Sequence, residues 1–234
     1  MSTPRTFRCQ AILFDLDGVL VDSQECVERT WRNWAARHRL DPARVIDAAH
    51  GRRAIDTIRA LAPSLDADAE LAALIATEAT ATEGVHEIPG ARELVRSLPP
   101  GRWAVVTSGT RAVAEFRLRH GRIPIPDVMI CADEIERGKP DPQGYLRAAA
   151  RLGVPPAQCV VVEDAPPGID AGIAAGMKVI AIAMTYPPDA LAAADAVADR
   201  MLDLRASLDG GEILVEIRAR SSPQRIDSWG TGSS

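Results

Sequence analysis

A chain of 234 residues with 47% hydrophobic and 25% charged residues has the composition of an ordinary soluble globular protein. The net charge of −5 at pH 7, without a basic run, argues against a nucleic-acid partner. No apolar run approaches the ~20 residues of a membrane span, and the N-terminus lacks the apolar segment of a secretory signal. We therefore expect a soluble, cytoplasmic monomer or weak homodimer with no membrane partner.

The four cysteines are far apart and form no CxxC pair, nor does a histidine lie beside any of them. They are Cys9, Cys26, Cys131 and Cys159. This spacing argues against a structural zinc site or a disulfide framework, and it predicts reduced thiols.

The first strand signal is the apolar run Ala11–Phe14, which leads directly into Asp15, Asp17 and Gly18. A short run of this kind is typical of a strand buried on both faces, and Asp and Gly disfavour its continuation. We expect the strand to end near Asp15, so that two acids lie at its carboxyl end, where open α/β sheets bind ligands. Taken alone, the stretch also fits a hairpin turn after an edge strand.

The next segment, residues 24–87, has a helical pattern. Apolar residues recur at helical spacing over 27–35, 55–61 and 71–75, and Asp41-Pro42 is typical of another helix start. No strand is predicted there. An all-helical block inserted between strand-bearing regions predicts a small cap domain. We expect the cap to act as a lid that hinges at its two connections to the rest of the chain.

From Ile88 onward, predicted strands alternate with helices. The strands are expected at 103–106, 128–131, 160–162, 179–184 and, more weakly, 196–198. This alternation predicts an α/β fold whose core is a Rossmann-like parallel sheet. Residues 1–23 and 88–208 would form the core and 24–87 the cap. Residues 209–234 would hold a possible edge strand at Ile213–Ile217 and a flexible tail over Ser221–Ser234.

Polar side chains follow four of these strands, where a parallel sheet would bring them to one edge. They are Asp15 and Asp17, Thr107 and Ser108, Lys139 one loop further on, and Glu163 and Asp164. Converging carboxylates repel one another unless a cation holds them, and Mg²⁺ prefers such oxygen ligands. A lysine and a hydroxyl beside a carboxylate–Mg²⁺ site then favour a phosphoryl group as the ligand.

Each element has a plainer interpretation when it is taken alone. Thr107-Ser108-Gly109 could be a helix N-cap, Lys139-Pro140 a solvated charge in a loop, and Glu163-Asp164 a second cap. The combination, in this order and at strand ends, favours the phosphoryl site.

Four motifs of the chain resemble those of the haloacid dehalogenase superfamily, and the resemblance extends from Ala11 to about Leu204. In chain order the motifs are DLDGVLVDS, VVTSGT, GKPDPQGYL and VVVEDAPPGIDAG. The helical insertion after the first motif resembles the subgroup with a helical cap, which includes β-phosphoglucomutase and many sugar-phosphate phosphatases. Within that subgroup, the chain looks most like the branch that contains glycerol-3-phosphatase and 2-deoxyglucose-6-phosphatase. The segments that carry this likeness are HGRRAIDTI, VVTSGT and EDAPPGIDAG. The resemblance implies a phosphoric monoester hydrolase.

Carried over to these positions, the resemblance implies that Asp15 is the nucleophile and Asp17 the general acid and base. Ser108 and the Gly109 N–H would hold the phosphoryl group, with Thr107 as the alternative to Ser108, and Lys139 would bind the same group. The Mg²⁺ ligands would be Asp15, the Asp17 backbone carbonyl and Asp164, with Glu163 in support.

The cap segment Ala49–Arg53 is expected at a loop-to-helix junction that faces this site. One interpretation is a solvated basic helix start; the other is that His50, Gly51, Arg52 and Arg53 meet the substrate or close over it. Two residues typical of β-phosphoglucomutase are replaced here, by Val27 and near Ala54, although Arg53 could substitute for the second.

The leading hypothesis is a Mg²⁺-dependent phosphatase for a small sugar or polyol phosphate, acting through an aspartyl-phosphate. The alternatives are a β-phosphoglucomutase-like phosphomutase and a non-catalytic protein that binds a phosphorylated metabolite.

Overall fold

The computed structural model describes residues 5–218, so the tail expected over Ser221–Ser234 lies outside the described residues. The core is a six-stranded sheet in which all neighbouring strands are parallel. In spatial order the strands are β6 (Val128–Ile130), β5 (Trp103–Val106), β2 (Ala11–Phe14), β7 (Cys159–Glu163), β8 (Lys178–Ile182) and β9 (Ala196–Ala198). Each corresponds to a strand predicted from an apolar run.

The chain enters this sheet at its centre. From β2 it builds outward through β5 to β6, and it then returns to β7 on the other side of β2. The reversal creates a topological switch point between β2 and β7, the place where open α/β sheets bind their ligands.

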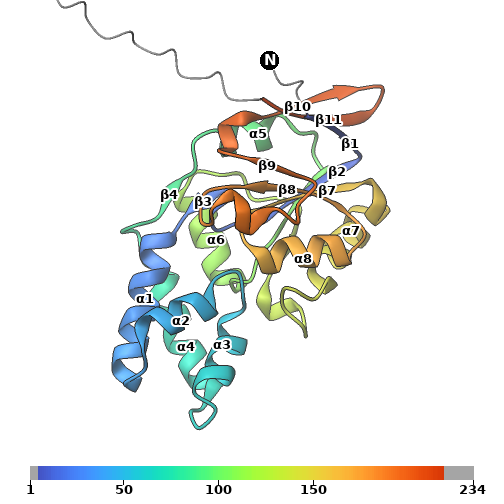
Figure 1. Ribbon diagram of the computed structural model, residues 1–234. Coiled ribbons are helices and arrows are strands. Elements are labelled where there is room, and N and C mark those ends of the chain that lie inside the picture. Colours follow the sequence, from blue (N-terminus) through green and yellow to red (C-terminus); the bar gives the residue numbers. More distant parts are fainter. Residues whose placement is uncertain (1–4, 219–234) are drawn as a thin grey trace, which may run out of the picture.

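Helices cover both faces of the sheet (Figure 1). They are α5 (Ala91–Ser97), α6 (Arg111–His120), α7 (Gln143–Leu152) and α8 (Pro166–Ala174). Successive residues of a strand point to opposite faces, so Ile12 packs with α5 and α6 whereas Leu13 packs with α7 and α8. This arrangement confirms the Rossmann-like α/β core. Short 3₁₀ turns occupy Ala132–Glu134, Pro156–Gln158, Pro188–Leu191 and Met201–Asp203.

The inserted cap is helical, as expected, and lies at one end of the sheet (Figure 1). Its helices are α1 (Gln24–His38), α2 (Pro42–Ala49), α3 (Ala54–Leu61) and α4 (Ala67–Glu78). Asp41 begins α2 by accepting the Ala43 N–H at 3.1 Å, with Pro42 at the first helical position. The rings of Trp31 and Trp34 form an edge-to-face pair with centroids 5.4 Å apart. They belong to a hydrophobic cluster that consists of cap residues and is separate from the clusters of the core.

The two connections between cap and core lie side by side. β3 (Val21–Asp22) pairs antiparallel with β4 (His86–Glu87), and Ile88 N–H donates to the Leu20 carbonyl at 3.1 Å. The prediction of no strand between residues 24 and 87 is therefore wrong for the last two residues of that segment. A two-residue strand is too short to show the alternation of apolar and polar residues that marks a strand.

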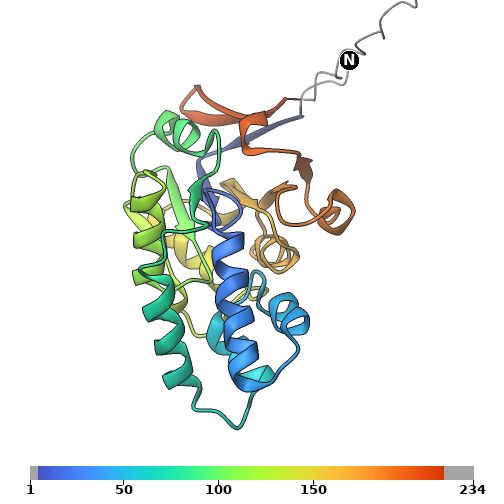
Figure 2. The same cartoon turned by 90° about the vertical axis from the view of Figure 1, so that its left-hand side faces the viewer.

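A second, three-stranded antiparallel sheet lies at the end of the molecule opposite the cap helices (Figure 2). Its order is β1 (Arg5–Cys9), β11 (Glu212–Ile217), β10 (Leu204–Asp209). The predicted edge strand is thus the centre of a separate sheet. Ile213 and Val215 from β11 pack into the same cluster as Ile12.

No helix within residues 5–218 is long and apolar enough to cross a membrane. The four cysteines are buried free thiols, in agreement with the expectation from their spacing.

Candidate active site

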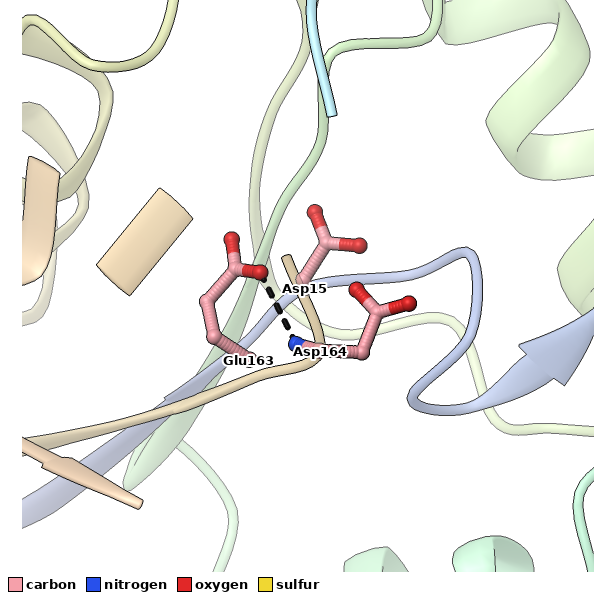
Figure 3. Close-up of side chains that lie close together, drawn as sticks. All are labelled: Asp15, Glu163 and Asp164. Atoms are coloured by element: carbon pink, nitrogen blue, oxygen red, sulfur yellow. Dashed lines mark hydrogen bonds between the residues drawn. The ribbon is translucent and has the colours of Figure 1, made fainter. Parts of the chain in front are cut away.

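Three carboxylates meet at the switch point of the parallel sheet. Asp15 directly follows β2, and Glu163 and Asp164 lie at the end of β7. One oxygen from each lies within 4.8 Å of the others, and all three residues are buried (Figure 3). Buried carboxylates this close repel one another unless positive charge lies between them. The cluster is therefore a candidate metal site, in agreement with the sequence prediction.

Lys139 supplies one positive charge to this cluster. Its ammonium group, which is also buried, donates to Asp15 Oδ1 and to Glu163 Oε1, the latter at 2.6 Å. Glu163 Oε1 also accepts the Tyr145 hydroxyl at 2.8 Å. Its other oxygen accepts the backbone N–H groups of Asp164 at 3.0 Å and Ala165 at 3.2 Å. Both oxygens of Glu163 thus have protein donors.

Two glycines make room for these acids. A Cβ on Gly18, whose φ is +79°, would collide with the Asp164 carboxylate, and a Cβ on Gly168 would collide with the Glu163 carboxylate. Because only glycine lacks that atom, the glycine of each motif permits the close packing of its acidic neighbour.

Burial and mutual repulsion dominate the electrostatics of the cluster. Burial raises the pKa of Asp15 to about 7, against the attraction of Lys139 and with a further increase from Glu163. Burial, together with Glu163 and Asp15, raises the pKa of Asp164 well above its usual value. The pKa of Lys139, which burial alone would lower, is raised by Asp15 and Glu163. A bound cation would favour the charged carboxylates.

The residues after β5 lie beside this cluster. Ser108 Oγ donates to the backbone carbonyl of Gly51 in the cap at 2.9 Å, and the Gly109 N–H donates to Thr107 Oγ1 at 3.0 Å. Thr107 is buried and Ser108 is half-buried. The two predicted phosphoryl donors therefore bind protein acceptors that a ligand could replace.

The loop between α2 and α3 contains the basic cap residues and reaches the core. Arg53 is only 8% exposed; it makes two bonds with Asp56, at 2.7 and 2.8 Å, and donates to the Ile135 carbonyl of the core at 2.8 Å. Its guanidinium thus fastens the cap to the core. His50 faces Tyr186 at 6.1 Å between ring centroids, and exposed Arg52 lines the cavity.

Asp17 lies on the cap side of the cluster and has two protein partners. Its Oδ1 accepts Ser23 Oγ at 2.7 Å and lies 2.7 Å from Arg117 Nη1. Arg117 also donates to Glu78, at the end of α4, at 2.9 Å. No sequence pattern marks Arg117 or Glu78 as functional, because charged residues in amphipathic helices usually face water.

A cavity of about 200 Å³ brings the expected residues together between cap and core. Its core wall includes Asp15, Asp17, Thr107, Ser108, Gly109, Lys139, Glu163 and Asp164. Its cap wall includes His50, Gly51, Arg52 and Arg53, together with apolar Val27, Trp31, Ile55, Leu71, Leu74 and Ile75. Sequence reasoning missed Thr185, which lines the cavity and donates to Asp164 Oδ2. It also missed Tyr145, whose aromatic ring in an apolar helix face indicated only core packing.

Comparison with known proteins supports the resemblance that the motifs indicated. The family model for haloacid dehalogenase-like hydrolases matches residues 9–176. The chain belongs to this family. The match spans the acidic cluster, Lys139 and the inserted helices, so these features belong to a family member and not to an isolated motif.

Relatives of this family member are named phosphatases. It is 48% identical over 180 residues to hexitol phosphatase A of Escherichia coli (strain K12), covering 75% of this chain and 83% of that protein. It is 37% identical over 201 residues to glycerol-1-phosphate phosphohydrolase 1 of Saccharomyces cerevisiae, covering 80% of each. These relatives confirm the expectation of a phosphoric monoester hydrolase.

Solved structures of the same fold include CbbY from Rhodobacter sphaeroides in complex with phosphate, with a TM-score of 0.73 at 24% identity, covering 83% of this chain and 96% of that one. β-Phosphoglucomutase from Clostridium difficile has a TM-score of 0.70 at 21% identity, covering 83% and 92%. At these identities the likeness shows the shared fold.

Proposed function

We propose that this protein is a Mg²⁺-dependent phosphatase that hydrolyses a small sugar or polyol phosphate through an aspartyl-phosphate. The observation that carries the proposal is the buried Asp15 carboxylate at the switch point, in contact with Lys139 and beside Asp164. Curated relatives named for hexitol and glycerol phosphates support the substrate class.

The donor atoms of the cluster fit a hard divalent cation. Lys139 donates to one carboxylate oxygen of Asp15, and Thr185 donates to one carboxylate oxygen of Asp164. Among the described residues, the other oxygen of each carboxylate is left for a metal. These oxygens and the backbone carbonyl of Asp17 would hold Mg²⁺, with Glu163 in support, and Mg²⁺ usually keeps several waters besides. When bound, the ion would neutralise charge on the carboxylates and on the phosphoryl oxygens.

In the first step, the Asp15 carboxylate attacks phosphorus and the bond to the substrate oxygen breaks. The proton of the Asp17 carboxyl passes to the departing alkoxide, which leaves as an alcohol. In the second step, Asp17 takes a proton from a water that attacks the phosphorus, which breaks the bond to Asp15 and releases inorganic phosphate. Both aspartates then return to their starting state.

The phosphoryl group would be held by residues that already lie around Asp15. Ser108 Oγ and the Gly109 N–H would turn from their protein acceptors to its oxygens, and the Lys139 ammonium would bind one of them. Lys139 is well placed for this task because it already contacts the proposed nucleophile.

The cap would limit the ester to a small alcohol. A cavity of about 200 Å³ accommodates a compact polyol. Its cap wall contains apolar side chains, the polar residues Gln24, Arg53 and Glu78, which have protein partners, and in addition His50 and Arg52. We propose that these two residues meet substrate hydroxyls and that residues 24–87 move as a lid on the paired strands β3 and β4.

The proposal is tested by phosphate release from a panel of hexitol, hexose and glycerol phosphates with Mg²⁺. We expect the parent protein to turn over at least one class and Asp15→Asn to lose release by about 10⁴-fold or more with an unchanged fold. Asp22→Asn, a cavity-lining aspartate outside the acidic cluster, is the matched control. Turnover of Asp15→Asn at the parental rate would exclude the mechanism.

The same protein separates a phosphatase from a phosphomutase. β-Glucose 1-phosphate followed by phosphorus NMR should give free phosphate, whereas a mutase would give glucose 6-phosphate. We expect phosphate, because the positions of the histidine and the arginine typical of the mutase fall here at Val27 and near Ala54, and both of these residues line the cavity. Tight binding of these esters without turnover would instead indicate a binding protein.

A further inference from the structure

One charged cluster on the cavity wall has no place in the chemistry described so far. Arg117, on α6 of the core, is 2% exposed and contacts two carboxylates. Its Nη1 lies 2.7 Å from Asp17 Oδ1 and its Nη2 lies 2.9 Å from Glu78 Oε2. Glu78 belongs to the cap, and in Figure 2 its helix α4 continues downward from α6. A single guanidinium therefore joins the cap to the proposed acid and base.

Stability alone gives little reason for this arrangement. Glu78 is the last residue of α4, where the helix dipole disfavours a negative charge. Arg117 Nε is buried with no hydrogen-bond partner among the described residues, which is unfavourable for a charged group. Since a buried ion pair is often no more stabilising than apolar packing, the cluster points to a role other than holding the fold.

The contacts of Asp17 indicate what that role is. One oxygen, Oδ1, accepts a hydrogen bond from Ser23 Oγ and forms an ion pair with Arg117 Nη1, and these two contacts fix the orientation of the carboxylate. Ser23 lies at the entry to the cap, and Arg117 is held from its other side by Glu78. All four residues line the cavity. The orientation of Asp17 thus depends on where the end of α4 lies.

We propose that Arg117 and Glu78 are positioning residues that aim Asp17 at the leaving-group oxygen when the end of α4 is seated on the core. Glu78 fixes the guanidinium, and the guanidinium holds Asp17 Oδ1. When the cap moves away, Glu78 leaves with α4 and the guanidinium loses its second anchor, which allows Asp17 to turn. This inference rests on the proposed phosphatase function, because Asp17 must protonate a leaving alcohol.

The leaving group gives a readout that a purely structural role would not produce. An alkyl phosphate such as glycerol phosphate needs a proton on its departing oxygen, whereas 4-nitrophenolate departs readily without one. The kcat/KM value covers steps only through departure of the alcohol, so it isolates the acid role of Asp17 from its later role as base. We expect Glu78→Ala to lower kcat/KM for glycerol phosphate about 10-fold and for 4-nitrophenyl phosphate less than about 2-fold.

Conservative variants should reduce kcat/KM for glycerol phosphate selectively as well, to different extents. Glu78→Gln keeps an acceptor for Arg117, so its selective loss should lie between those of Glu78→Ala and the parent. Arg117→Lys keeps the charge but cannot bridge two carboxylates in the same way, so it should show the same selective loss. Thermal melting of each variant checks that it is folded.

Glu70→Ala is the matched control, because Glu70 lies on the same helix but binds Trp34 and His38 inside the cap, at 2.9 and 3.1 Å. It should change kcat/KM for the two esters by the same factor. An equal loss for both esters in Glu78→Ala, or no loss for either, would overturn the inference while leaving the phosphatase proposal intact. A parent protein without phosphatase activity would overturn both.

Discussion

Glu163 Oε1 accepts a hydrogen bond from Lys139 Nζ at 2.6 Å, and this contact restricts what Glu163 can do in the acidic cluster. The Tyr145 hydroxyl uses the same oxygen and two backbone N–H groups use the other. Glu163 therefore orients Lys139 and the turn that carries Asp164. Asp15 and Asp164 are left as the carboxylates with oxygens available to a cation.

This division of labour predicts unequal effects on metal binding. Asp164→Asn should reduce Mg²⁺ affinity by more than about 100-fold, because it removes the charge of a direct ligand. Glu163→Gln should reduce it by about 10- to 100-fold, as for a group that supports a ligand. Calorimetric titration of both folded variants with Mg²⁺ measures the difference. A larger loss in Glu163→Gln would identify Glu163 as the direct ligand.

The raised pKa of Asp15 predicts how metal-free protein responds to pH. Its folded pKa of about 7 exceeds the usual 3.8, so between these values the folded state binds more protons than the unfolded state. The stabilisation is complete below about pH 4 and is lost as pH rises through about 7. The Tm of the chelator-treated parent, relative to Asp15→Asn, should fall over that interval.

Saturating Mg²⁺ should abolish or reverse that fall, because the ion favours the charged carboxylate. A difference in Tm between parent and Asp15→Asn that stayed constant from about pH 4 to about pH 8 would contradict the raised pKa.

The phosphoryl-binding loop gives a comparison between adjacent hydroxyls. Ser108→Ala should weaken competitive inhibition by inorganic phosphate about 10-fold, because it removes a proposed donor to the phosphoryl oxygens. Thr107→Val should change it less than about 3-fold, because the Thr107 hydroxyl accepts the Gly109 N–H. The opposite order would assign the phosphoryl contact to Thr107.

The two cap arginines should separate into different roles. Arg53→Met removes bonds to Asp56 and to the Ile135 carbonyl, so it should lower the free energy of unfolding by roughly 2 kcal/mol. Arg52→Met should leave the Tm nearly unchanged and raise KM, because exposed Arg52 lines the cavity. Thermal melting and steady-state kinetics measure both effects. A KM increase confined to Arg53→Met would reverse the assignment.

The parallel sheet could be predicted from the sequence because its strands and the acids that follow them form short local patterns. Apolar runs such as Ala11–Phe14 and Trp103–Val106 marked the parallel strands, and the acids after them marked the ligand-binding edge. The second sheet escaped prediction because β1 and β10 are mostly exposed and polar, and β1 pairs with β11, more than 200 residues away in the sequence. Pairing at that separation leaves no local pattern.

The residues of the candidate site likewise differ in whether a local sequence pattern marks them. Asp15, Lys139 and Asp164 could be found because each stands in a compact motif. Arg117 and Glu78 could not, because helical spacing alone makes each look like part of a solvent-facing surface. Arg117 is buried and Glu78 is half-buried because α4 and α6 meet across the boundary between cap and core.

Asp17→Asn with 4-nitrophenyl phosphate and Mg²⁺ tests directly whether Asp15 is phosphorylated during turnover. This ester can transfer its phosphoryl group without a general acid, but water cannot then be activated to release it. We expect a burst of about one nitrophenolate per protein, followed by a stall, with the phosphoryl group found on Asp15 by peptide mass spectrometry. A phosphoryl group on another residue, or none at all with continued turnover, would contradict this expectation.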